Sequence, residues 1–321
     1  MPIALWRKTI AEAQWLLLGC ATVVFGFCWM FVWLQSLFEM GRFAQLLEVF
    51  RPEFERFSPI PFEHMLTYTG RISVAYDHPI VFLTIAIWAI ARGSDAVSGQ
   101  LGRGTLEMVL GQPIRRVQVV LTHTMVSVVG AALIALAAWG GTWCGVQTVS
   151  IEKKPSTWSL PGLSFEIRNP FVDSEPRWVP MSDEVDAKHF VPAAVNLFSA
   201  GVFLAGVAAL MSSWDRYRWR TIGIVSGFLL VQMILKVVAV SADDLHWLVY
   251  LTFMGAYEPL QWVSISVYEP QQLWSFVLTG EEGQWIGVGP VGCNFALLLM
   301  GAASFVGAGV IFCRRDLPAP I

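Results

Sequence analysis

The sequence contains few charged residues for its length. Only 14% of its 321 residues are Asp, Glu, Lys or Arg, against roughly 25% in soluble domains, and 55% are hydrophobic. A soluble protein with so few charges could not cover its surface with polar groups. The chain also lacks a basic run or a basic tail, so nucleic acid is not an expected partner.

Motifs for metal binding, nucleotide binding and catalysis are also lacking. The five cysteines form no CxxC pair and lie in or beside apolar stretches, which favours buried free thiols over disulfides or a metal site. No GxxxxGK[ST], HExxH or GxSxG run occurs, so the chain is not expected to hold nucleotide phosphates, to contain catalytic residues or to be an enzyme. The histidines are scattered singly.

Long apolar runs are what the sequence does have. A helix needs about 20 apolar residues to cross the hydrocarbon core of a bilayer. The runs predict an all-α integral membrane protein that forms one transmembrane domain over 1–321. We expect Asp77 and Pro79 to begin the second helix, with Asp77 as its N-cap. The expected spans cover residues 15–38, 73–92, 117–146, 191–214, 221–242 and 285–313.

Basic residues favour the cytoplasmic side of a membrane, and their density here predicts that both termini are cytoplasmic. Three arginines crowd the turn between the fourth and fifth spans. The basic residues of the predicted inside segments are Arg7, Lys8, Arg92, Arg103, Arg115, Arg116, Arg216, Arg218, Arg220, Arg314 and Arg315. The cytoplasmic loop is then 93–116, and the extracytoplasmic loops are 39–72, 148–189 and 243–284.

The outer loops differ in character. Residues 41–57 carry apolar side chains at helical spacing and predict an interfacial amphipathic helix. Residues 148–189 are polar and predict a small lobe or a mobile loop. Between the fifth and sixth spans, Pro259 and Pro270 divide an aromatic-rich stretch into pieces too short to span, which predicts re-entrant or interfacial helices.

A short helix is predicted between the second and third spans. Thr105 is the expected N-cap, and Glu107 falls in the first turn, where the helix dipole favours a carboxylate. Gly111 suits a left-handed residue after the helix end. The predicted helix covers about 106–110, between glycine turns, and is tied directly to two spans. Such an element can pass motion from a cytosolic partner into the membrane.

These residues also carry a family resemblance. The run Gly104-Thr105-Leu106-Glu107, followed by Leu110, Pro113 and Arg115-Arg116, resembles the signature after the second span of ABC-2 type permeases, the membrane subunits of ATP-binding-cassette exporters. Three further places resemble the family's N-terminal helix, its loop between spans four and five, and its C-terminal end. They are Arg7-Lys8 with Glu12, Ser212 to Arg216, and Arg314 to Leu317.

The resemblance implies a six-span subunit that dimerises with a second copy or a relative and carries two cytosolic ABC ATPase subunits. ATP would then be used by the partner, with no cofactor bound directly. The short helix would be the coupling helix, and the site would be the inner (plasma) membrane of a prokaryote. The implied coupling residues are Gly102, Arg103, Gly104, Thr105, Leu106, Glu107, Leu110, Pro113, Arg115 and Arg116. One departure is Gln100, where the family often has Glu.

Three polar residues at membrane depth are candidates for a substrate path: Gln232, Lys236 and Asn294. Intramembrane charge is often functional, but Lys236 lies within two turns of Asp243 and Asp244 and could instead snorkel to the outer surface. The two amides could equally serve hydrogen bonding between helices. Small residues, including the Gly223 and Gly227 pair, favour close helix packing.

Two other functional classes remain open at this point. A membrane scaffold or assembly factor would act through the extracytoplasmic loops and would tolerate changes around Glu107. An intramembrane enzyme would need converging acids, histidines or a nucleophile at membrane depth, and the spans carry almost none. The substrate class is not indicated by any residue pattern.

Overall fold

The computed structural model describes residues 3–38, 48, 51, 58–153, 157–159, 166–168, 177–280 and 283–315. Six helical runs in it are long and apolar enough to cross a membrane, which confirms the expected all-α membrane class. They are α1 (Ile3–Ser36), the run Tyr68–Gly102, α9 (Arg116–Thr148), the run Ala187–Trp214 containing α10 (Val191–Trp214), α11 (Arg218–Ser241) and α13 (Pro290–Arg314).

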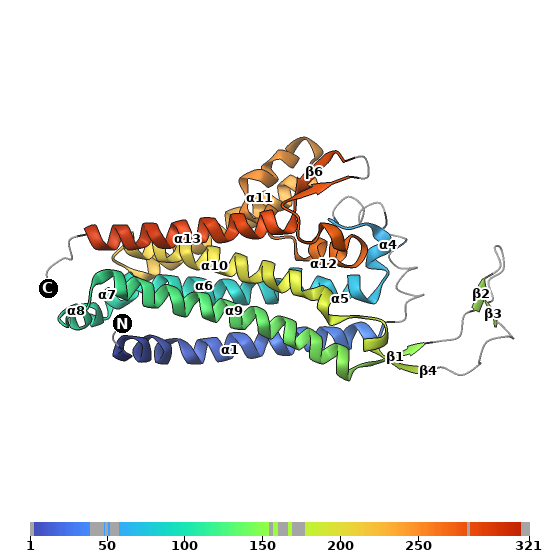
Figure 1. The fold of residues 1–321 in the computed structure, drawn as a ribbon, viewed down its shortest axis with the longest axis horizontal. Helices are drawn as coiled ribbons and strands as arrows, with labels where there is room; N and C mark the ends of the chain where they lie inside the picture. Colours follow the sequence, from blue (N-terminus) through green and yellow to red (C-terminus); the bar gives the residue numbers. More distant parts are fainter. Residues whose placement is uncertain are drawn as a thin grey trace.

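The long helices form an elongated bundle, in which α10 packs against α13, α6 (Pro79–Ser94) and α9, while α1 packs along α9 (Figure 1). The run Tyr68–Gly102 and α10 are the most buried of the six, whereas fewer than a third of the residues in the apolar windows of α1, α11 and α13 are buried. We call the end that carries α8 (Thr105–Leu110) the α8 end, and the opposite one the α12 end, after α12 (Pro259–Tyr268). The start of α1 and the end of α13 both lie at the α8 end (Figure 1).

Glycine allows two of these helix contacts. A Cβ on Gly206 of α10 would lie 2.5 Å from the carbonyl oxygen of Gly301 in α13, so the two backbones touch. A Cβ on Gly130 of α9 would overlap the ring of Trp88, which is fully buried and donates its Nε1 proton to Ser127 O at 2.9 Å. By contrast, no described atom outside the adjoining backbone of α11 lies within 4 Å of such a Cβ on Gly223 or Gly227.

The second span differs from its prediction at both ends. It begins with α5 (Tyr68–Asp77), and α6 follows after a break at His78, whose side chain accepts a hydrogen bond from Ile80 N and so caps α6. Asp77 is therefore the last residue of α5 and not the expected N-cap.

At its other end, the second span continues through a π-helical turn, η1 (Asp95–Gly99), into α7 (Gln100–Gly102). The Oγ of Ser212 in α10 accepts hydrogen bonds from Val97 N at 3.2 Å and Ser98 N at 2.9 Å, which gives this wide turn partners outside its own helix. The predicted 93–116 loop is correspondingly shorter, because its first ten residues are helical.

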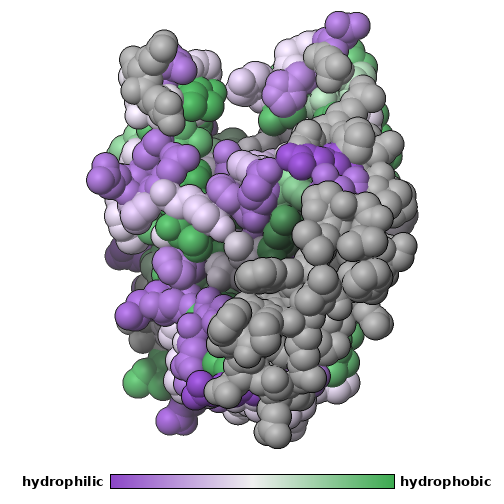
Figure 2. Space-filling view, turned by 90° about the vertical axis from the view of Figure 1, so that its right-hand side faces the viewer, coloured by the Kyte–Doolittle hydropathy of each residue, from purple (hydrophilic) through white to green (hydrophobic). Residues whose placement is uncertain are grey.

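The α12 end is built from short elements. Around α4 (Phe62–Met65) and α12 lie the short helices η2 (Met181–Asp183), η3 (Ala187–Phe190), η4 (Asp243–Leu251), η5 (Phe253–Gly255) and η6 (Pro270–Gln272). Three antiparallel pairs complete it: β1 (Ser150–Lys153) with β4 (Arg177–Pro180), β2 (Thr157–Ser159) with β3 (Glu166–Arg168), and β5 (Val277–Thr279) with β6 (Trp285–Val288). Figure 2 views this end and shows hydrophilic and hydrophobic side chains side by side.

Of two predictions for the outer loops, one is wrong and the other falls outside the described residues. The last span was expected to start at Trp285, but residues Trp285–Val288 form a strand and the helix starts at Pro290. Apolar β-branched residues fit either structure, and pairing with β5 decides for the strand. The amphipathic helix expected over 41–57 lies outside the described residues, apart from Glu48 and Arg51.

Candidate functional site

The short helix α8 projects from the α8 end of the bundle (Figure 1). It starts after Gly104, whose φ of 68° is the left-handed conformation that glycine adopts without strain. Leu106 is 1% exposed and fixes the helix to the protein, whereas Met108 is 75% exposed. The helix thus has one anchored side and one side free for a partner, with Glu107 exposed as well.

Two details of the predicted helix ends are wrong. Thr105 is the first helical residue rather than the N-cap, and its hydroxyl donates to Gln100 Oε1 at 2.6 Å. Gly111 has a φ of −68° and is not left-handed. Among the described residues, positive φ occurs only at Gly104 and Gly283.

Gln100 joins α8 to the N-terminal helix. Its Oε1 accepts hydrogen bonds from Lys8 Nζ, at 2.8 Å, and from the Thr105 hydroxyl. Its Nε2 donates to Glu12 Oε2 at 3.0 Å and to Asp95 Oδ2 at 3.3 Å. Because the ammonium can only donate and the carboxylates can only accept, these partners fix the orientation of the amide. We call Lys8, Glu12, Asp95, Gln100 and Arg103 the Gln100 cluster.

Asp95 is a buried member of this cluster, 3% exposed, and three arginines surround it. Arg103 binds it with both terminal nitrogens, at 2.7 Å to Oδ1 and 3.1 Å to Oδ2. This hydrogen bonding to the carboxylate raises the pKa of Arg103. Arg218 Nη1 lies 3.5 Å and Arg92 Nη1 3.7 Å from the same carboxylate, beyond good hydrogen-bonding distance. The cluster therefore connects α1, the π-helical turn and the segment before α8.

The remaining predicted coupling residues lie on either side of α8. Gly102 ends α7, and Pro113 lies in the turn before α9. Arg115 is exposed, with its backbone N–H bonded to Gln118 Oε1, and Leu110 is half-buried. Arg116 Nη1 donates to Arg315 O at 2.6 Å and to Phe312 O at 3.3 Å.

A second arginine connects the end of α13 to the end of α10 at the α8 end. Arg315 Nη1 donates to Ser213 O and to Asp215 O, both at 3.0 Å. The start of α9 is thus bonded to the end of α13, and the end of α13 to the end of α10. Cations placed on helix C-terminal carbonyls satisfy free acceptors and oppose the helix dipole.

At the α12 end, the predicted substrate-path residues have different surroundings. Gln232 Oε1 accepts from Phe253 N at 3.1 Å, and Asn294 Oδ1 accepts from Asn196 Nδ2 at 2.9 Å. Both amides thus hold neighbouring elements together. Lys236 differs from them, because its Nζ lies 2.9 Å from Glu258 Oε1 and donates to Tyr257 O at 3.1 Å.

Lys236 and Glu258 line a recess of about 900 Å³ between α11, η4 and the β5–β6 hairpin, together with Asp77 and His246. The recess carries two carboxylates against one ammonium, with apolar side chains between them. Burial raises the pKa of Glu258; Asp77 raises it further, and Lys236 opposes both effects. The ion pair accounts for Lys236 without the predicted snorkelling toward Asp243 and Asp244.

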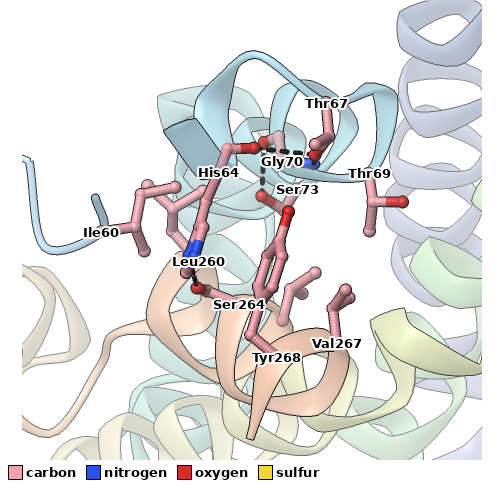
Figure 3. A pocket seen from close by; sticks show the side chains of 11 residues that line it. Ile60, His64, Thr67, Thr69, Gly70, Ser73, Leu260, Ser264, Val267 and Tyr268 are labelled. Carbon is pink, nitrogen blue, oxygen red and sulfur yellow. Dashed lines mark hydrogen bonds between the residues drawn. The ribbon is translucent and has the colours of Figure 1, made fainter. Parts of the chain in front are cut away.

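A smaller cavity marks the contact between α12 and the α4–α5 segment (Figure 3). Its volume of about 10 Å³ would hold at most one water. His64 Nδ1 lies 2.6 Å from Ser264 Oγ, and the imidazole stacks on Tyr268 with 3.5 Å between ring centroids. The close-up shows these side chains facing one another across two elements, so this contact positions α12 rather than binding a ligand (Figure 3).

Comparison with known proteins decides the family. Residues 9–163 match the family model described as ABC-2 family transporter protein. Over this stretch, just under half of its length, the chain is an ABC-2 type permease. The match contains α8 and every member of the Gln100 cluster except Lys8. A search among curated proteins finds no match.

Reasoning from the sequence missed how the charged residues at the α8 end pair with one another. Lys8, Glu12, Arg92 and Arg218 served only as markers of topology or family, and Gln100 only as a departure from a pattern. One local signal was present, since Arg92 and Asp95 are three residues apart and share a helix face. In the part of the permease that the structure describes, no group of His, Cys, Asp and Glu could hold a metal ion.

Proposed function

We propose that this permease is the membrane-spanning subunit of an ATP-binding-cassette exporter, driven by a separate cytosolic ATPase that contacts α8. The observation that carries the proposal is the form of α8, a short helix with Leu106 buried and Met108 exposed beyond the end of the bundle. In this proposal the α8 end and both chain ends face the cytoplasm of a prokaryotic cell. The basic residues gathered there support that orientation.

The coupling route runs from α8 into two spans. Thr105 is bonded to Gln100, and the π-helical turn next to Gln100 is bonded to α10 through Ser212. A displacement of α8 by the ATPase therefore acts on α1, through Lys8 and Glu12, and on α10 at the same time. A dimer, formed with a second copy or a relative, completes the proposed transporter.

A photo-crosslinking amino acid placed at two exposed positions tests the assignment in membranes of the native host. At Met108 we expect a crosslink to a soluble chain containing a GxxxxGK[ST] loop. The matched control is Trp178 of β4, which is 68% exposed at the α12 end and should not crosslink that chain. Crosslinking from Trp178 but not from Met108 would overturn the proposed orientation.

Function is tested with two variants of α8. Glu107→Arg reverses a charge on the exposed side, and Leu106→Asp removes the buried anchor. Both should weaken ATPase binding and transport. If both bind the ATPase and transport normally while deletion of an outer loop abolishes function, the scaffold alternative replaces the exporter.

A further inference from the structure

A second recess lies at the α8 end, next to the Gln100 cluster. It has a volume of about 380 Å³ and is lined by residues of α1, the α6–η1 region and α11, and by Arg103 after α7. Its charged residues are Arg92, Arg103, Arg218, Glu12 and Asp95. None of the roles proposed above for α8 uses the space that these side chains surround.

Arg92, in the wall of this recess, has two side-chain nitrogens without an acceptor in the described part of the chain. Its side chain is buried, with 3% of the residue exposed, and Nε and Nη2 have no hydrogen-bond partner among the described residues. Its nearest carboxylate, on Asp95, is 3.7 Å away and is already bound by both terminal nitrogens of Arg103. A buried charged donor without an acceptor is costly, so this guanidinium is suited to an anion from outside the chain.

The charges around the recess favour an anion overall. Three guanidinium groups line it against two carboxylates, and Lys8 lies 3.7 Å from Glu12, so one of those carboxylates has its own cation. Arg218 supplies a second available cation at the rim. Its side chain is 40% exposed, and its remaining hydrogen bonds, to Ala91 O and Ser94 Oγ, are long at 3.3 and 3.4 Å.

We propose that this recess binds a phosphate group, held between Arg92 in the wall and Arg218 at the rim. The planar guanidinium fork matches phosphate oxygens in pairs, which makes arginine the usual residue for such recognition. The phosphate has two possible sources, an anionic lipid headgroup at the membrane surface or a soluble phosphate compound. The recess shares Glu12, Asp95 and Arg103 with the Gln100 cluster, but phosphate binding there requires neither contact of α8 with an ATPase nor a particular exported substrate.

Binding is measured on the purified full-length chain in detergent. Native mass spectrometry with phosphatidylglycerol and phosphatidylcholine as probes reports lipid retention, and a thermal shift with inorganic phosphate reports soluble-anion binding. We expect Arg92→Gln and Arg218→Gln to reduce retention of phosphatidylglycerol, or the phosphate shift, about tenfold. Arg220→Gln is the matched control, since Arg220 pairs with Asp215 and does not line the recess.

The sign of the effect gives an additional test. Glu12→Gln removes one carboxylate from the recess and should increase binding of the same probe. If Arg92→Gln does not fold, Arg218→Gln still tests the site, because its side chain is at the exposed rim. Loss of phosphatidylglycerol retention assigns a lipid, and loss of the phosphate shift alone assigns a soluble anion. If neither changes relative to Arg220→Gln, the proposal is wrong.

Discussion

Gln100→Glu changes one atom at the centre of the Gln100 cluster and is the sharpest test of it. The variant loses the Nε2 hydrogen bonds to Glu12 at 3.0 Å and Asp95 at 3.3 Å. A hydrogen bond to a charged group contributes about 1.5–3 kcal/mol, so the two together are worth roughly 3–6 kcal/mol. The new carboxylate also faces two others, although Lys8, at 2.8 Å from Oε1, offsets part of the repulsion.

We expect a net destabilisation of about 3 kcal/mol from these opposing contributions. For a chain of 321 residues, each kcal/mol shifts the Tm by about 1.5 °C, so the Tm falls by roughly 4–5 °C. Intrinsic tryptophan fluorescence during heating at one fixed scan rate, in one detergent, measures the shift. The matched control is Gln112→Glu, which makes the same change at an exposed position in the same segment.

A double variant that exchanges the acid and the amide between positions 12 and 100 distinguishes the loss of these hydrogen bonds from a general effect of added negative charge. Glu12→Gln combined with Gln100→Glu restores one amide-to-carboxylate hydrogen bond, between positions 12 and 100, and should recover about half of the lost Tm. Equal Tm values for Gln100→Glu and Gln112→Glu would refute the reasoning. They would mean that the amide does not bridge the two acids.

Three further outcomes follow from the packing and the α12 end. Gly206→Ala should destabilise the chain by about 1–3 kcal/mol in thermal unfolding, because its Cβ meets backbone of α13, whereas Gly223→Ala should not. Lys236→Met leaves the Glu258 carboxylate without its partner and should cost about 1–3 kcal/mol, most of which a second change, Glu258→Gln, restores. Burial lowers the pKa of His64, so its contribution to stability is present above the usual histidine pKa and is lost as the pH falls below it. The Tm advantage of the parent over His64→Gln should therefore shrink between pH 7.5 and pH 5.5, and an unchanged difference would contradict this.

The number of spans could be predicted because bilayer thickness sets a minimum length for any apolar helix, and six runs meet it. The ends of the spans could not be predicted, because contacts with other elements decide where each helix begins and ends. Ser212 of α10 supports the π-helical turn that extends the second span, and pairing with β5 makes Trp285–Val288 a strand. Neither partner is visible from hydropathy.

The predicted short helix coincides closely with α8, since glycines and a buried leucine are local signals. The Gln100 cluster could not be predicted in the same way. Its contacts join Gln100 to residues 88 and 92 positions earlier, and they depend on how α1 packs beside α6. The contact of α8 with an ATPase remains a prediction.

The arginine contacts at the α8 end also constrain the order of events during synthesis. The carbonyls of Ser213 and Asp215 receive their partner from Arg315, which leaves the ribosome about a hundred residues later. The acceptors of Arg116, on Phe312 and Arg315, are synthesised almost two hundred residues after it. Helices α9 and α10 can insert as they are made, but this end of the bundle closes only after α13 arrives. A nascent chain stopped before α13 should therefore expose these helix ends to proteases until synthesis resumes.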